Sequence, residues 1–293
     1  MNTLTSVGII GNGAIGSALG KLLAESGLEV DYCDQDAQKC TVGTVADLVR
    51  LHNVIFICTP TAVLRSVAQS IADDLKAESE PRLVVALSKG VEPKFVTAVQ
   101  ILESESHGGY DFGVLYGPMI ASELNAGHRG GAVLATSQQW DVSALQATRL
   151  KVELSSDPKS VAYCGVFKNI YAFAHGVSDG LSLGGNFKAM LTTYSLLEID
   201  KVMAELEADH LVWEGLAGIG DLLGTAYSSA STNYQAGVAF ANGQTDVGGE
   251  GYHSLQQLNH VVKTENYPIL NCLVGMVTKG LPPASLEAAV AKA

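Results

Sequence analysis

A glycine-rich loop near the start of the chain constrains the fold more than any other feature. Residues Gly11–Gly16 read Gly-Asn-Gly-Ala-Ile-Gly and directly follow the β-branched run Val7–Ile10. The loop opens a helical pattern, and a second strand pattern, Val30–Cys33, follows it and ends at Asp34. The order strand, loop, helix, strand predicts the unit that begins a doubly wound sheet. The apolar face of the helix consists of Ile15, Ala18, Leu19, Leu22 and Leu23.

Each glycine of this loop has a separate expected role. Gly11 permits a tight turn, Gly13 lets the backbone approach a pyrophosphate, and Gly16 lets the helix pack closely on the strand. The helix N-terminus then presents unpaired N–H groups and the positive end of its dipole to phosphate groups. The loop therefore predicts a dinucleotide-binding site. The alternative is that the glycines only punctuate a turn between a strand and a helix.

Asp34 indicates which dinucleotide this site prefers. Its carboxylate can accept hydrogen bonds from the adenosine ribose hydroxyls. Asp36 adds a second negative charge two residues later, and only Lys39 is near enough in sequence to offset a 2′-phosphate. The pattern favours NAD over NADP. The alternative is that Asp34 is an ordinary solvated acid at the end of a strand.

Short β-branched runs recur through the first half of the chain, with helical patterns between them. The runs are Val7–Ile10, Val30–Cys33, Val54–Cys58, Leu83–Leu87, Val114–Tyr116, Ala132–Ala135 and Val152–Leu154. Continuous apolar strands that alternate with helices predict a parallel sheet covered on both faces. Beyond Asp157 the sequence shows helical patterns and no strand series. We therefore expect an α/β fold with an N-terminal Rossmann doubly wound parallel sheet, residues 1–158, followed by an all-helical C-terminal domain, residues 159–293.

Composition excludes several classes of partner. The net charge of -12 argues against nucleic acid and against an anionic membrane surface, because both present negative phosphate groups. We see neither a signal peptide nor an apolar run long enough to span a bilayer, so we expect no membrane insertion. The five cysteines lack C-x-x-C spacing and the seven histidines lack H-x-x-x-H spacing. We therefore expect a cytoplasmic protein with free thiols, no metal and a small-molecule substrate.

A long apolar helix pattern in the second half carries one charged side chain at its centre. Residues Ser160–Gly176 are apolar nearly all round, which predicts a buried helix, and Lys168 lies in the middle. Burial disfavours the charged ammonium and lowers its pKa, so a buried Lys168 would be a good proton donor. The alternative is that the stem of Lys168 extends to the surface. Periodicity alone leaves both readings open.

Local sequence motifs favour a buried Lys168 that acts as a proton donor. Cys164–Asn169 reads CGVFKN, and Gly176–Leu181 reads GVSDGL. These segments resemble the signature of NAD-dependent glycerol-3-phosphate dehydrogenases. Further segments resemble that family in the same order along nearly the whole chain. They are Gly11–Gly16, Ser88–Gly90, Gly117–Leu124, Gly218–Leu222 with Thr225, and Glu250–Tyr252.

The resemblance implies hydride transfer between NAD(H) and a small secondary alcohol or ketone, namely sn-glycerol 3-phosphate and dihydroxyacetone phosphate, in a homodimer. It assigns catalytic roles to Lys168, Lys89 and Asp221. With the glycine-rich motif, it assigns cofactor contacts to Gly11, Asn12, Gly13, Ala14, Ile15, Gly16, Asp34, Thr59, Pro60, Lys89, Ala121, Gly248 and Glu250. Substrate contacts are implied for Lys89, Gly117, Met119, Lys168, Asn169, Asp221, Thr225, Ser231, Thr232 and Asn233. For Asp221 the alternative is a helix cap after Gly220.

The chain departs from the family pattern where the substrate phosphate would bind. Thr232 and Tyr194 stand where the family has arginines, Met119 stands where it has a hydroxyl residue, and His175 replaces a small residue. Each lost charged hydrogen bond is worth about 1.5–3 kcal/mol. For His175 we favour a packed, hydrogen-bonded core residue over a catalytic one.

Three hypotheses follow from these departures. In the first, phosphate binding is weaker and is compensated by Lys89 or Lys188. In the second, the same chemistry acts on another short ketone or aldehyde. The third is a catalytically silent NADH-binding protein, against which the joint retention of Lys89, Lys168 and Asp221 argues.

Overall fold

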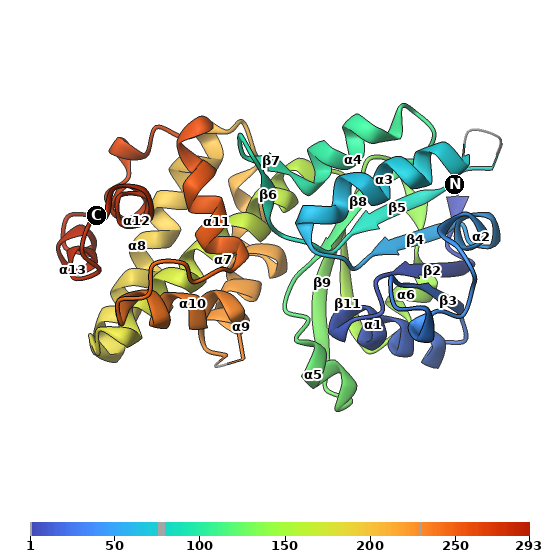
Figure 1. The fold of residues 1–293 in the computed structure, drawn as a ribbon, viewed down its shortest axis with the longest axis horizontal. Helices are drawn as coiled ribbons and strands as arrows, with labels where there is room; N and C mark the ends of the chain where they lie inside the picture. The colour runs from blue at the N-terminus through green and yellow to red at the C-terminus, as the bar shows by residue number, and fades with distance from the viewer. Residues whose placement is uncertain (1, 76–79, 229) are drawn as a thin grey trace. The chain divides into compact units, whose positions relative to one another are not determined.

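The structure is a computed structural model that describes residues 2–75, 80–228 and 230–293 (Figure 1). The chain forms two compact units. The first comprises Met1–Ser88 and Ala98–Ala162, and the second comprises Lys89–Thr97 and Tyr163–Ala293. The division into domains at residue 158 stays a prediction.

The first unit is built on a seven-stranded sheet in the order β11-β9-β8-β5-β4-β2-β3. Its strands are β2 (Ser6–Ile10), β3 (Glu29–Cys33), β4 (Val54–Ile57), β5 (Leu83–Ala86), β8 (Asp111–Tyr116), β9 (Gly130–Thr136) and β11 (Leu150–Ser155). Every predicted run forms a strand, and the doubly wound fold is confirmed. One pair differs from the expected parallel sheet, because β8 and β9 run antiparallel. The helix that joins them, α5 (Ala121–Asn125), has only five residues, whereas parallel neighbours need a longer crossover.

Helices cover both faces of this sheet (Figure 1). On one face lie α1 (Ala14–Glu25), α5 and α6 (Ser143–Gln146), which contribute Leu19, Leu124 and Leu145 to one buried apolar cluster. On the other lie α2 (Val45–Leu51), α3 (Thr61–Leu75) and α4 (Ala98–Ser106). A further short pair, β1 (Asn2–Thr3) and β10 (Trp140–Asp141), runs parallel outside the main sheet.

The second unit is mainly helical. Its helices are α7 (Pro158–Gly180), α8 (Gly184–Glu205), α9 (Asp221–Ala226), α10 (Thr232–Ala241), α11 (Glu250–Gln257), α12 (Pro268–Lys279) and α13 (Ser285–Val290). Residues 160–178 of α7 are buried without interruption, as the apolar pattern predicts. Over the described part of the chain, no helix combines the length and the hydropathy that a bilayer crossing requires.

A small hairpin from the first half of the chain belongs to the second unit. Its strands, β6 (Val91–Glu92) and β7 (Val96–Thr97), pair antiparallel. They lie outside residues 159–293, whose described part contains helices and no strand, as predicted. At the turn, Phe95 has a φ of 63°, a left-handed conformation that costs a non-glycine residue about 1–3 kcal/mol. The Phe95 ring offsets this cost by burial against Tyr163 and Phe167 of α7, at centroid distances of 6.5 and 6.1 Å. This packing holds Lys89, at the base of the hairpin, within the second unit.

Candidate active site

Two lysines share one buried carboxylate in the second unit. Lys168 lies midway along α7 and is only 7% exposed, and Asp221, the first residue of α9, is 4% exposed. Lys168 Nζ lies 3.3 Å from Asp221 Oδ1 and donates a hydrogen bond to Thr225 Oγ1 at 2.9 Å. Lys89 Nζ donates to Asp221 Oδ2. The structure therefore brings the three predicted catalytic residues together.

The segment before α9 explains how Asp221 reaches the lysines. Residues Leu216–Gly220 form a π-helical turn that runs directly into α9. A Cβ atom at Gly218 would lie 2.1 Å from the carbonyl oxygen of Trp213, so this turn requires glycine. Gly220 holds the N-cap position, and the Asp221 side chain bonds to lysines, so the alternative role of Asp221 as a helix cap is wrong.

The electrostatics of this cluster favour proton transfer. Burial lowers the pKa of Lys168 to about 8; the Asp221 carboxylate opposes that shift, and the Lys89 ammonium adds to it. Burial alone would raise the pKa of Asp221, but the two ammonium groups outweigh it and hold that pKa below its ordinary value. The alternative in which Lys168 extends to the surface is wrong. Its ammonium is instead poised to exchange a proton near neutral pH.

A chain of side-chain amides joins three helices beside this cluster. Asn233 Nδ2 on α10 donates to Asn169 Oδ1 on α7 at 2.9 Å. Asn169 Nδ2 in turn donates to Glu250 Oε2 on α11 at 3.1 Å. The backbone N–H of Gly251 closes the network by donating to Asn233 Oδ1 at 2.9 Å. These contacts fix the residue after Lys168 and the start of α11 relative to each other.

Gly251 is expected to be irreplaceable in this network. In Gly251→Ala, the new Cβ atom would lie 2.2 Å from the carbonyl oxygen of Asn169, so the backbone of α7 or α11 must shift. We expect the free energy of unfolding to fall by about 1–3 kcal/mol, measured by urea denaturation. Gly185→Ala on α8 is the control, because a Cβ atom there meets no atom within 4 Å. Equal urea midpoints for the two variants would contradict this packing.

The glycine-rich loop follows β2 and lies at the carboxyl ends of β2, β3 and β4. Gly11 has a φ of 97°, and its N–H donates to Cys33 O at 2.8 Å. A Cβ atom at Gly16 would lie 2.0 Å from Gly11 O, so α1 begins in close contact with the loop. Between them, a Cβ atom at Gly13 would meet nothing within 4 Å, which leaves open space at the N-terminus of α1. This space is the cradle that a pyrophosphate requires.

The strand order supports this location. The chain order reverses between β2 and β4, and ligands of such sheets bind at that switch point. Thr59 and Pro60 follow β4 there, and a Cβ atom at Gly11 would lie 3.0 Å from Thr59 Cγ2. Met119 and Ala121, from the segment after β8, pack with Ile15 on the apolar cluster beneath α1. Gly117 lies just before them at a φ of 155°, where a Cβ atom would lie 2.4 Å from Gly131 O.

Asp34 is part of this loop structure rather than a free surface acid. Its Oδ2 accepts from the N–H of Asn12 at 2.7 Å, and its Oδ1 accepts from the N–H of Asp36 at 3.0 Å. The Asp36 bond contributes most to lowering the pKa of Asp34. Lys39 Nζ lies 3.9 Å from Asp36 Oδ2, so its charge is already beside a carboxylate. A 2′-phosphate at this position would meet two acids and one paired lysine.

Among the residues that depart from the family pattern, His175 has a structural role, whereas Thr232 and Tyr194 lie on α10 and α8; Ser231 and Gly248 complete the predicted set. The Ser231 hydroxyl accepts from the N–H of Tyr234 at 3.3 Å and caps α10, whereas Thr232 is exposed. His175 is buried with Nε2 3.2 Å from Thr192 Oγ1, and burial lowers its pKa to about 4. This agrees with the packed histidine that we favoured. Tyr194 is half-buried on α8, and Gly248 has a φ of 66° just before α11.

Lys188 has partners that the sequence did not indicate. Its Nζ lies 2.8 Å from Asp179 Oδ2, and the same oxygen accepts from the Tyr234 hydroxyl at 2.7 Å. Asp179 belongs to one of the quoted motifs, but the Tyr234 contact joins positions 55 residues apart, which no local spacing reveals.

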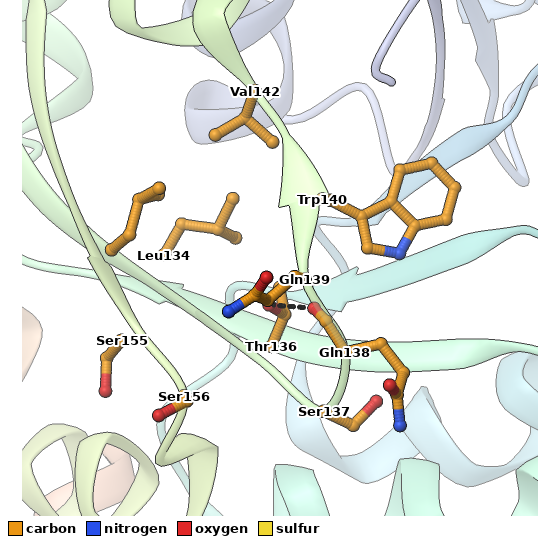
Figure 2. A pocket seen from close by; sticks show the side chains of 10 residues that line it. Leu134, Thr136, Ser137, Gln138, Gln139, Trp140, Val142, Ser155 and Ser156 are labelled. Atoms are coloured by element: carbon orange, nitrogen blue, oxygen red, sulfur yellow. Dashed lines mark hydrogen bonds between the residues drawn. The ribbon is translucent and has the colours of Figure 1, made fainter. Parts of the chain in front are cut away.

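A separate pocket of about 500 Å³ in the first unit contains none of the predicted site residues (Figure 2). It opens beside Thr136 and Ser155, at the carboxyl ends of β9 and β11, and all of its lining residues are uncharged. The lining therefore offers no cationic side chain to an anionic substrate. Among the described residues, no group of three or more His, Cys, Asp or Glu side chains is arranged to hold a metal.

Comparison with known proteins identifies the family. The model of the NAD-dependent glycerol-3-phosphate dehydrogenase N-terminus matches residues 40–141, and the C-terminus model matches residues 157–287. A glycerol-3-phosphate dehydrogenase [NAD(P)+] of Pseudomonas syringae pv. tomato is 32% identical over 83% of this chain and 78% of its own length. One of Acinetobacter baylyi is 28% identical over 99% of this chain and 90% of its own.

Solved structures agree on the fold. The crystal structure of glycerol-3-phosphate dehydrogenase from Coxiella burnetii superposes with a TM-score of 0.83 at 22% identity, covering 99% of this chain and 98% of that one. The enzyme of Saccharomyces cerevisiae gives a TM-score of 0.78 at 19% identity, covering 98% and 99%. The chain therefore belongs to the NAD-dependent glycerol-3-phosphate dehydrogenase family.

Proposed function

We propose that the protein transfers hydride between NAD(H) and a small secondary alcohol or ketone, namely sn-glycerol 3-phosphate and dihydroxyacetone phosphate. The observation that carries the proposal is the buried cluster in which Lys168 and Lys89 share the Asp221 carboxylate. Family membership supplies the substrate pair, because the relatives are glycerol-3-phosphate dehydrogenases.

The cluster has the chemistry that ketone reduction needs. A bound nicotinamide supplies or accepts the hydride. The substrate oxygen gains negative charge as the carbonyl is reduced, and a nearby ammonium group in a buried site stabilises that charge strongly. Lys168 donates a proton to this oxygen and takes one from the alcohol in the reverse direction, which a pKa of about 8 allows. Asp221 positions both ammonium groups, and Thr225 holds the Lys168 Nζ from the next turn of α9.

The first unit has the features that hold the cofactor. The open space at Gly13 and the N-terminus of α1 fit the pyrophosphate, and Asp34 fits the adenosine ribose. Asp36 and its pairing with Lys39 favour NAD over NADP. Titrations of the protein fluorescence with NADH and NADPH test this preference, and tighter binding of NADPH would contradict it.

Gly13→Ala is expected to separate cofactor binding from stability. The new Cβ atom meets no protein atom, so the free energy of unfolding should stay within about 1 kcal/mol of wild type. The same atom would occupy the space that the pyrophosphate needs, so the affinity for NADH should fall by about tenfold or more. NADH fluorescence titration and urea denaturation give the two quantities. An unchanged NADH affinity would show that the pyrophosphate binds elsewhere.

An absorbance assay at the NADH band tests the activity. Rapid NADH oxidation with dihydroxyacetone phosphate supports the proposal. The second candidate, the same chemistry on a short carbonyl compound with another tail, is favoured by the exposed Thr232 and the half-buried Tyr194, neither of which offers a cation. Turnover of dihydroxyacetone or a short aldehyde without turnover of the phosphorylated ketone supports that candidate. NADH binding without turnover of any compound in such a panel indicates a silent binding protein.

We also propose a homodimeric state, which the family resemblance supports, and a cytoplasmic location, which the five cysteines without C-x-x-C spacing support. Light scattering coupled to size-exclusion chromatography measures the first, and cell fractionation measures the second. A monomeric mass at assay concentration would contradict the dimer.

A further inference from the structure

Two cysteines, Cys33 and Cys40, flank the short loop that carries Asp34. Cys33 is the last residue of β3, and the chain returns to it at Cys40 after Asp36 caps a short 3₁₀ turn, η1 (Ala37–Lys39). Two hydrogen bonds just outside the pair close this loop. The N–H of Thr41 donates to Tyr32 O at 3.0 Å, and the N–H of Tyr32 donates to Thr41 Oγ1 at 2.8 Å. The fold therefore holds residues 33 and 40 side by side.

The two thiols are close neighbours. Cys40 lies near enough to the Cys33 thiol to help raise its pKa, in addition to the larger effect of burial. Cys40 Sγ also accepts from the N–H of Asp34 at 3.1 Å and donates to Asp34 O at 3.2 Å. Cys33 is 9% exposed and Cys40 is partly exposed, so an oxidant in solution reaches Cys40.

We propose that Cys33 and Cys40 form a reversible disulfide that weakens cofactor binding at the glycine-rich loop. The oxidant is a peroxide. The Cys40 sulfur attacks the O–O bond and becomes a sulfenic acid, and the other oxygen leaves as water after it takes up the thiol proton. The Cys33 sulfur then attacks the sulfenic sulfur, the S–S bond forms, and a second water leaves. Two thiols and one hydrogen peroxide thus give one disulfide and two waters, and a dithiol reductant reverses the change.

The geometry and electrostatics suit this sequence of steps. A disulfide needs its sulfur atoms about 2.05 Å apart and its Cα atoms within about 7 Å. The hydrogen bonds between Tyr32 and Thr41 bring together the residues next to the two cysteines. Burial raises the pKa of the Cys33 thiol, and Cys40, Asp34 and Asp47 add to that effect. Cys33 therefore stays a thiol while Cys40, the more exposed of the two, meets the oxidant first.

The loop between the two cysteines connects directly to the proposed cofactor site. The Asp34 carboxylate accepts from the N–H of Asn12, and Lys39 O accepts from Asn12 Nδ2 at 2.9 Å. A disulfide removes the proton that Cys40 donates to Asp34 O and draws the sulfur away from the N–H of Asp34. Asp34 and Asn12 must then adjust together. This regulatory effect rests on the proposed function, because it requires that NADH binds at the loop.

Peptide mapping tests the disulfide itself. Trypsin cleaves after Lys21, Lys39 and Arg50, so Cys33 and Cys40 fall in separate peptides, residues 22–39 and 40–50. After treatment with hydrogen peroxide, we expect the two peptides to be joined, two hydrogen atoms lighter than their sum, and to separate with dithiothreitol. Cys33→Ser and Cys40→Ser should each abolish the joined peptide. Cys272→Ala, which removes a buried thiol on α12, should leave it unchanged. Absence of the joined peptide in wild-type protein overturns the proposal.

NADH fluorescence titration tests the consequence for binding. We expect peroxide to weaken NADH binding about tenfold in wild type and in Cys272→Ala, with recovery after dithiothreitol. Cys40→Ser should bind NADH equally well before and after peroxide. A joined peptide with unchanged NADH affinity overturns the regulatory effect. A reduced protein that binds no NADH overturns the proposed function and the regulation with it, whereas the joined peptide still decides whether the disulfide forms.

Discussion

Lys168→Met is expected to lower kcat for dihydroxyacetone phosphate reduction by about a thousandfold, because it removes the proposed proton donor and a charge that stabilises the developing oxyanion. Methionine has a similar length and suits an apolar setting, so α7 should keep its packing. Asp221 retains its contact with Lys89, so the variant leaves no carboxylate without a cation. Stopped-flow or steady-state absorbance of NADH measures the loss.

The matched control is Lys159→Met, which removes a lysine from an exposed position at the start of the same helix. We expect kcat within about twofold of wild type, because an exposed substitution outside the cluster changes little. Thermal unfolding of both variants verifies the fold. Folded Lys168→Met that retains most of its kcat would remove Lys168 from the mechanism.

Asp221→Asn is expected to shift the pH dependence of catalysis toward acid. In wild type, kcat/KM for ketone reduction should fall above a pH of about 8, because the reaction needs the Lys168 ammonium, whose pKa burial lowers to that value. Alcohol oxidation should rise through the same range, since it needs the neutral amine. The Asp221 carboxylate raises the pKa of Lys168, so its removal should move both midpoints down by about one unit or more.

Profiles of kcat/KM against pH in both directions measure these midpoints. Asp179→Asn is the control, because it also removes a carboxylate from a lysine, Lys188, but outside the Lys168 cluster. Its midpoint should match that of wild type. A midpoint for Asp221→Asn that matches wild type would mean that another group sets the pH dependence.

Much of the fold could be predicted because its signals are local. The β-branched runs mark all seven strands of the main sheet, and Gly11–Gly16 marks the start of α1. The antiparallel pairing of β8 with β9 could not be predicted, because the direction of a strand depends on the connection rather than on its own residues. The six-residue helix α9 is too short to show a helical period of its own.

The candidate site could likewise be predicted only where its signals are local. The apolar pattern around Lys168 indicates a buried ammonium group, but it cannot identify the counterion. Asp221 and Lys89 are 132 positions apart, so their contact follows from the tertiary fold, and the family resemblance assigns both residues to the site without predicting that contact. The same is true of the Asn169–Asn233 bond, which joins positions 64 apart. Periodicity describes one element at a time, whereas this site combines the segment at Lys89 with α7, α9, α10 and α11.

The hairpin β6–β7 has a consequence for how the protein is made. Because residues 89–97 pack with residues 163–293, the ribosome synthesises Lys89 long before its partners on α7 and α9 exist. The left-handed turn at Phe95 is therefore not stabilised by the Tyr163 and Phe167 rings until those residues have been synthesised. A fragment that begins after residue 158 would lack Lys89 altogether. The second unit can therefore be completed only after both residues 89–97 and residues 163–293 have been synthesised.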